Sequence, residues 1–134
     1  MIGITDGKPQ KETISGLHNL RFHAFTYSVP ASERAARIEH VLRITELWDR
    51  RQSQVRTYSG GMKRRLEIAR GLLHHPRVLF LDEPTLGLDP DVSIRLRAQI
   101  ASLRRERGTT IILTTHYMRE AEELCDEIAF IKDG

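Results

Sequence analysis

The sequence predicts an α/β fold with a parallel β-sheet, because short apolar runs alternate with helical patterns along the chain. Two uninterrupted apolar runs, residues 78–81 and 111–113, are each preceded by a helical pattern and followed by polar residues. Such runs are typical of strands buried on both faces of a parallel sheet. Between them stands Asp89-Pro90, a strong helix start. Right-handed crossovers between parallel strands follow from this order.

The composition is that of a globular protein with one core. The 134 residues are 40% hydrophobic and 29% charged, which suits a single compact domain. No apolar run approaches the roughly 20 residues that span a bilayer, and no signal-peptide pattern is present. The single cysteine, Cys125, excludes an internal disulfide and fits a reducing cytosol. With aromatic residues at 6%, the net charge of +3 favours a solvated surface over a nucleic-acid-binding patch.

The N-terminal half contains two predicted helices. Residues 1–31 show little periodicity, and we expect a loop there with at most one short strand. Apolar residues at helical spacing predict a helix from Glu33 to about Trp48, with Ser32 available as its cap. A polar connector follows, and a second helix is predicted from Gly61 to about His74.

The C-terminal half supplies the strands. We expect buried strands at residues 77–82 and 109–114, separated by a helix that begins after Asp89 and ends at Gly108. The inward side chains of that helix are predicted to be Val92, Leu96, Ile100 and Leu103. His116 is predicted to open a short helix. A last strand is expected from Glu127 to Ile131, before an Asp133-Gly134 turn.

The first chemical signal is a glycine-led helix start. Ser59, Gly60 and Gly61 stand at the beginning of the second predicted helix. Glycines let backbone N–H groups approach a phosphate, and the positive end of the helix favours an anion. The alternative is a plain helix cap, which a Ser-Gly-Gly taken alone would usually be. The basic residues that follow, Lys63, Arg64 and Arg65, are interpreted as a solvated helix face.

The second signal is an acid pair at a strand end. Asp82 and Glu83 directly follow four apolar residues. Ligands collect at the carboxyl ends of parallel strands, and one acid could hold Mg²⁺ while the other orients or deprotonates a water that attacks a phosphate. The alternative is a pair of acids that caps the next turn.

The third signal is a histidine at the same predicted edge. His116 follows the strand that ends near Thr114. An imidazole at this position could contact a γ-phosphate or fix the attacking water. A lone histidine is usually structural, but this one shares its edge with the acid pair.

Together these residues resemble the ATP-binding cassette (ABC) family, in the bacterial multidrug and antibiotic exporter branch that includes daunorubicin-resistance proteins. Tyr58 to Met62 is similar to the signature motif, with Met62 where many members have glutamine. Val78 to Glu83 resembles the Walker B strand and catalytic glutamate. Gly87-Leu88-Asp89 is similar to the D-loop, and Thr114-Thr115-His116 to the switch histidine. The resemblance covers about residue 17 to the end.

The resemblance implies a partial P-loop NTPase (RecA-like) core with an α-helical ABC subdomain. In that division residues 1–16 are a remnant loop near the Q-loop region, and residues 17–75 form the helical subdomain that ends in the signature helix. Residues 76–134 then form the C-terminal half of the RecA-like core.

The family's phosphate-binding loop, Gly-x-x-x-x-Gly-Lys-Ser/Thr, does not occur in these 134 residues. The one Gly-Lys pair is Gly7-Lys8, and Pro9 follows it. The Q-loop glutamine is also unassigned, since an ungapped count reaches Asp6 and a shorter loop would reach Gln10. We therefore expect the ATP-grasping N-terminal half to be missing, and the chain to stop where family members continue.

The resemblance further implies a mechanism with ATP and Mg²⁺. Two cassettes pair head to tail, and Ser59, Gly60, Gly61 and Met62 of one cover the nucleotide of the other, with Asp89 at the seam. Asp82 serves Mg²⁺, while Glu83 and His116 are catalytic. A transmembrane permease would hold the protein on the cytoplasmic face of the membrane. No nucleic-acid partner is expected.

Because the phosphate cradle is missing, we expect negligible ATPase activity from this chain alone. Two alternatives to the exporter ATPase remain open. One is an inactive fragment or interaction module that pairs with an intact cassette. The other is an ABC ATPase that acts on nucleic acid or ribosomes; salt-sensitive binding to either would support it.

Overall fold

The three strands in the described part of the chain form one parallel sheet, as the alternation of strands and helices predicts. The computed structural model describes residues 2–3 and 12–132. The strands are β1 (Ile2–Gly3), β2 (Val78–Asp82) and β3 (Thr110–Thr114), in the order β1-β2-β3. The helices are α1 (Gly16–Thr26), α2 (Ala31–Ile44), α3 (Gly60–Leu72), α4 (Pro90–Arg107) and α5 (Met118–Leu124), with 3₁₀ turns η1 (Trp48–Arg50) and η2 (Val55–Thr57).

The register of the sheet decides which residues meet at its edges. Val78 of β2 lies opposite Thr110 of β3, and Asp82 lies opposite Thr114. Because the pairing is parallel, both strands end at the same edge of the sheet. The segments that directly follow Asp82 and Thr114 in the sequence therefore start close together in space.

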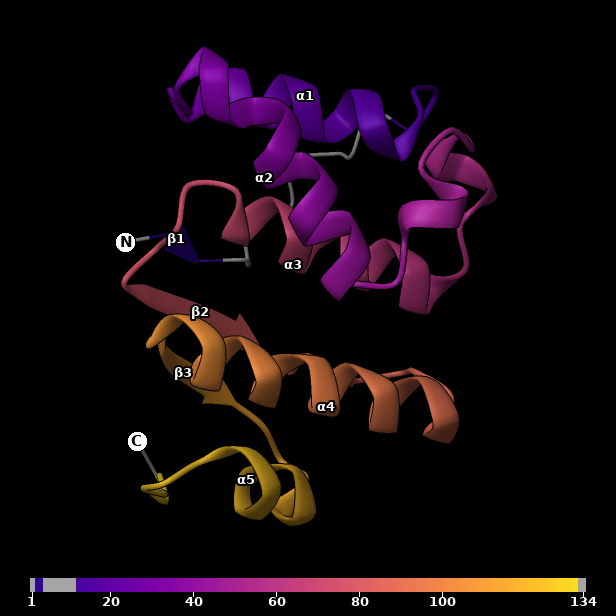
Figure 1. Cartoon of the computed structure of the whole chain (residues 1–134). Coiled ribbons are helices and arrows are strands. Elements are labelled where there is room, and N and C mark those ends of the chain that lie inside the picture. The colour runs from indigo at the N-terminus through magenta and orange to yellow at the C-terminus, as the bar shows by residue number, and fades with distance from the viewer. Residues whose placement is uncertain (1, 4–11, 133–134) are drawn as a thin grey trace.

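The helices divide into two groups around the sheet. In Figure 1, α1, α2 and α3 lie together above β2, whereas α4 and α5 lie below it in this view. The helices α1, α2 and α3 pack on one another, and α3 also contacts α4. Fully buried leucines, among them Leu20, Leu42 and Leu66, fill the space between them. Burial of these side chains is the main favourable contribution to folding.

The predicted start of α3 near Gly61 and the predicted end of α4 at Gly108 agree with the structure to within one residue. Ser59 caps α3, since its hydroxyl accepts a hydrogen bond from the Met62 amide at 3.2 Å. Gly108 ends α4 with φ of 61°, the left-handed conformation that glycine adopts without steric cost. At the start of α4, Asp89 has the N-cap position before Pro90, but its side chain makes no capping hydrogen bond.

The prediction of a loop before residue 32 was wrong for Gly16–Thr26, which forms α1. The hydroxyl of Ser15 caps this helix by accepting from the His18 amide at 3.3 Å. Its buried face is narrow and includes the polar Asn19 beside Leu20 and Ala24, so the apolar pattern in the sequence is weak. Tertiary packing selects the helix here.

The helix predicted from Glu33 to Trp48 has different ends. It begins after Pro30 rather than at a Ser32 cap, and it stops at Ile44. Glu46 has φ of 55°, which breaks the helical path. Trp48 therefore lies in the separate turn η1.

The strands are less buried than predicted. Leu79 and Leu81 of β2 are buried, but Val78 and Phe80 are half-buried, and β3 alternates between exposed and half-buried residues. Ile112 of β3 is exposed, whereas its neighbours Ile111 and Leu113, on the other face of the strand, are half-buried.

The last predicted strand, Glu127 to Ile131, is not formed. Strand geometry requires a neighbouring strand to satisfy its backbone groups, and in the described part of the chain this segment pairs with none. Phe130 and Ile131 are exposed there. The short helix also begins at Met118, two residues after His116. The predicted Asp133-Gly134 turn, the Gly7-Lys8 pair and the Q-loop candidates Asp6 and Gln10 lie outside the described residues.

Candidate functional site

The acid pair and His116 lie along one edge of the sheet. Asp82 is the last residue of β2, and Thr114 is its partner at the end of β3. The Glu83 amide donates to the Thr114 carbonyl at 2.9 Å, so strand pairing continues one residue past β2. His116 follows two residues later. Parallel pairing thus brings His116 close to two acids that lie 33 and 34 positions before it in the sequence.

Glu83 and His116 are in direct contact. The Nδ1 atom of His116 lies 3.0 Å from Oε1 of Glu83, within hydrogen-bonding distance. Glu83 has φ of 43°, an unusual value for a residue with a side chain, which turns the chain away from the strand direction. The two side chains are 35% and 55% exposed for Glu83 and His116. A carboxylate and an imidazole in this arrangement can together orient a water or contact a phosphate.

Asp82 is fixed by a partner that the sequence reasoning did not identify. The Thr114 hydroxyl donates to Oδ1 of Asp82, across the register of β2 and β3. The carboxylate is exposed and is an oxygen ligand of the type that Mg²⁺ prefers. Among the residues that the structure describes, no group of three or more His, Cys, Asp or Glu side chains could hold a metal. The Asp82 carboxylate would supply one oxygen ligand to a bound Mg²⁺.

The predicted phosphate-binding residues form a second group at the start of α3. Ser59 and Gly60 are exposed, and a Cβ added to Gly60 would meet no atom within 4 Å. A Cβ added to Gly61 would lie 2.5 Å from Cγ1 of Val92, in the first turn of α4. The absence of a Gly61 side chain thus lets the starts of α3 and α4 approach, close to the exposed Asp89 at the N-cap of α4. Met62 is half-buried and packs against the core.

These two glycines provide a matched pair of substitutions. Gly61→Ala is expected to destabilise the fold by about 1–3 kcal/mol, because the new methyl group would overlap Val92. Gly60→Ala is expected to be neutral or slightly stabilising, since the space is open and alanine favours helix. Urea unfolding of both variants measures the difference. Equal stability of the two variants would contradict the close packing of α3 on α4.

The interpretation of the basic residues after Met62 as a solvated face was wrong for two of them. The Arg64 and Arg65 side chains are only 20% and 11% exposed. Arg65 donates to Glu46 at 3.1 Å, and the burial of its guanidinium lowers its pKa. Arg64 donates to the backbone carbonyls of Asp82 and Pro84. No sequence signal marks Arg64, because its contacts depend on how α3 packs beside the end of β2.

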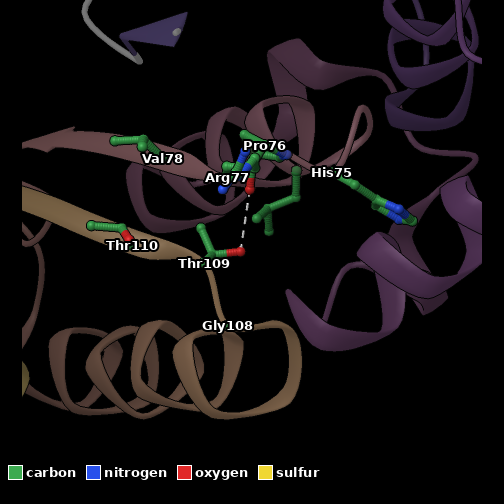
Figure 2. A pocket seen from close by; sticks show the side chains of 8 residues that line it. His75, Pro76, Arg77, Val78, Gly108, Thr109 and Thr110 are labelled. Atoms are coloured by element: carbon green, nitrogen blue, oxygen red, sulfur yellow. Dashed lines mark hydrogen bonds between the residues drawn. The ribbon is translucent and has the colours of Figure 1, made fainter.

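A cavity of about 730 Å³ opens at the opposite edge of the sheet, where the strands begin. Figure 2 shows its walls on either side of the hydrogen bond from the Thr109 hydroxyl to the Pro76 carbonyl, with the His75 ring directed away from Thr109. The cavity is lined by Leu72, His75, Pro76, Arg77, Val78, Gly108, Thr109 and Thr110. Ligands of parallel α/β sheets bind at the carboxyl ends of strands, so we assign the candidate site to the edge with Glu83 and His116.

A parallel sheet flanked by helices, with acids and an imidazole at the carboxyl ends of its strands, defines an α/β domain of the kind that binds ligands at those strand ends. The chain belongs to the ABC transporter family, whose sequence profile matches residues 6–86. CbiO1 from Clostridium perfringens, described as part of the ABC transporter complex CbiONQ, has a similar structure with a TM-score of 0.77. It is 32% identical and covers 85% of this chain and 45% of that one. The predicted fold class is thereby confirmed.

Relatives with curated names include resistance proteins. The linearmycin resistance ATP-binding protein LnrL of Bacillus subtilis is 39% identical over 91% of this chain and 39% of its own length. The daunorubicin resistance ATP-binding protein DrrA3 of Streptomyces coeruleorubidus is 41% identical over 92% of this chain and 39% of its own. The chain thus spans about two fifths of the length of these relatives. No helix among the described residues has the length and apolar character to cross a bilayer.

Proposed function

We propose that this chain carries the signature and hydrolysis half of an ATP-binding subunit in an ABC-type exporter of drugs or other small molecules. The family match and the relatives named for drug resistance support this function. The observation that carries the proposal is the 3.0 Å contact between Glu83 and His116 beside Asp82, on one edge of a parallel sheet. The exporter's transported substrate would be set by its membrane partner.

In this proposal Glu83, His116 and Asp82 each have a separate role in ATP hydrolysis. Glu83 accepts a hydrogen bond from the attacking water and polarises it. His116 contacts the γ-phosphate and keeps the Glu83 carboxylate in place through the bond between them. Asp82, held by the Thr114 hydroxyl, is the protein ligand of Mg²⁺, which would neutralise charge on the phosphates.

The start of α3 is proposed to cover a nucleotide held by a second cassette. Ser59 and Gly60 are exposed, and the open space at Gly60 allows a phosphate close to the backbone. Gly61 lies between that surface and α4, and Met62 supplies the amide that Ser59 caps. Asp89, exposed at the start of α4, would lie at the seam between the two cassettes.

The division of the chain follows the same proposal. Residues 17–75 act as the helical subdomain, which docks on a permease at the inner face of the membrane. Residues 76–134 act as the C-terminal half of the RecA-like core, and residues 1–16 as the segment near the Q-loop. The packing of α1, α2 and α3 on one another supports the first of these units.

The phosphate cradle is proposed to come from polypeptide outside these 134 residues. A lysine and backbone amides of a glycine-rich loop normally hold the β- and γ-phosphates, and that pattern does not occur in this sequence. The isolated chain is therefore expected to release phosphate from ATP no faster than the buffer does. A steady-state phosphate assay checks this, and turnover that Glu83→Gln removes would contradict it.

A chimera tests the proposed function itself. The aligned segment of this chain would replace the corresponding segment of LnrL, which is 39% identical and longer. We expect the folded chimera to hydrolyse ATP with Mg²⁺ present and to pair when ATP binds. A folded chimera without ATPase activity, beside an active LnrL control, would contradict the assignment of the edge residues to hydrolysis. Copurification with DNA or ribosomes that salt disrupts would instead favour the nucleic-acid alternative.

A further inference from the structure

The guanidinium of Arg64 reaches from α3 to the backbone on both sides of Glu83. Its Nη2 atom donates to the carbonyl of Asp82, and its Nε atom makes a longer contact of 3.4 Å to the carbonyl of Pro84. The remaining Nη1 atom donates to Glu67 at 2.8 Å, one turn further along α3. All three nitrogen atoms of the guanidinium thus have an acceptor, and the planar geometry of the group fixes the direction of each N–H donor.

The residue between these two carbonyls is the strained one. Glu83 has φ of 43°, a conformation that costs a residue with a side chain free energy unless its surroundings hold it. The β3 strand holds one side, because the Glu83 amide donates to Thr114 at 2.9 Å. The Glu83 carbonyl accepts from the Leu86 amide at 3.1 Å. Arg64 adds contacts from α3, at the carbonyls of Asp82 and Pro84.

We propose that Arg64 is a positioning residue for Glu83. By holding the carbonyls of Asp82 and Pro84, it keeps the intervening backbone in the turned conformation that directs the Glu83 carboxylate to His116. Arg64 touches no reacting group itself, and it acts through the backbone alone. The catalytic consequence rests on the proposed function of Glu83, whereas the positioning can be measured without any ATPase activity.

The same contact connects the two groups of candidate residues. Arg64 stands five residues after Ser59 on α3, one turn beyond the exposed helix start. A shift of that turn, for example on contact with a partner's nucleotide, would move the guanidinium and with it the backbone around Glu83. The position of the Glu83 carboxylate would thus depend on the position of α3.

Two measurements on the intact 134-residue chain test the positioning. The imidazole ¹⁵N signals of His116, assigned with a His116→Gln variant, report its hydrogen bond to Glu83, and Glu83→Ala gives the signals without that bond. Arg64→Ala is expected to move the His116 Nδ1 signal at least half of the way to the Glu83→Ala value. Amide hydrogen exchange of Leu86 is expected to become about tenfold faster in Arg64→Ala.

Matched variants separate positioning from a general loss of stability. Arg65→Ala removes the neighbouring arginine, which bonds to Glu46 instead, and is expected to leave both signals at their wild-type values. Arg64→Lys keeps the positive charge but lacks the planar set of N–H donors of a guanidinium. It is expected to shift the His116 Nδ1 signal by an intermediate amount. If Arg64→Ala does not fold, the His116 and Leu86 signals of Arg64→Lys test the proposal instead.

Wild-type His116 and Leu86 signals in folded Arg64→Ala, or in Arg64→Lys when the alanine variant does not fold, would overturn the proposal. An equal change in Arg65→Ala would overturn it as well. In the LnrL chimera, Arg64→Ala should lower kcat and leave KM close to its original value. If Arg64→Ala changes the NMR signals as expected but the chimera with the original Arg64 is inactive, the proposed function is wrong and the positioning holds. Thus the two failures are distinguishable.

Discussion

Replacing Glu83 with glutamine in the LnrL chimera is expected to lower kcat for ATP hydrolysis by about a hundredfold to ten-thousandfold, the usual contribution of a positioned general base. Glutamine retains the size of the side chain and can still bond to His116, but it cannot accept a proton from water. Glu83 and His116 are 3.0 Å apart, and both side chains are partly exposed to solvent. Steady-state phosphate release over a range of ATP concentrations separates kcat from KM.

Two controls make this result specific. ATP binding to the chimera, followed by a fluorescent nucleotide analogue, should be unchanged by Glu83→Gln, because in the proposed function the carboxylate acts on the water and not on the ground-state nucleotide. Glu122→Gln, a substitution of an exposed acid on α5, should leave kcat unchanged. A Glu83→Gln chimera that retains more than about a tenth of the original kcat would contradict a role as general base.

Replacing Leu66 with alanine is expected to destabilise the chain by about 2–5 kcal/mol, a large part of the total stability of a small domain. Leu66 lies on α3 and is fully buried in the cluster that joins the helices to the strands. Its truncation removes apolar contacts and leaves a cavity that the neighbouring side chains cannot fill without strain. Chemical denaturation followed by far-ultraviolet circular dichroism measures the loss.

The matched control is an exposed apolar residue on a helix. Ile94 of α4 is 57% exposed, and Ile94→Ala is expected to change stability by no more than about 0.5 kcal/mol. If Leu66→Ala and Ile94→Ala cost the same free energy of unfolding, the packing of α3 at the centre of the fold would be contradicted.

The parallel sheet and its carboxyl edge were predictable from local patterns. The apolar run before Asp82 and the run before Thr114 each have the length of a strand, and helical spacing lies between them. That order is enough to place both strand ends on one edge. Asp82, Glu83 and His116 lie there, although their roles in hydrolysis remain proposals.

Features that depend on distant neighbours were not predictable in this way. The helix α1 has too narrow an apolar face to stand out in the sequence, and its buried Asn19 hides the pattern further. The run Glu127 to Ile131 has strand composition but no neighbouring strand in the described part of the chain. Its backbone N–H and C=O groups therefore have no strand with which to form hydrogen bonds there. Arg64 looks like any surface arginine until α3 is packed along β2.

By itself, the sequence determined the alternation of strands and helices, the cap at Ser59, the left-handed end at Gly108 and the pair of acids where β2 ends. These depend on residues within a few positions of one another, because capping, periodicity and turn conformation are local. Only the tertiary structure decided that His116 meets Glu83, that Thr114 holds Asp82, and that Arg64 reaches the backbone around Glu83. Those contacts join residues 18 to 33 positions apart, and the register of the sheet and the packing of α3 set their distances.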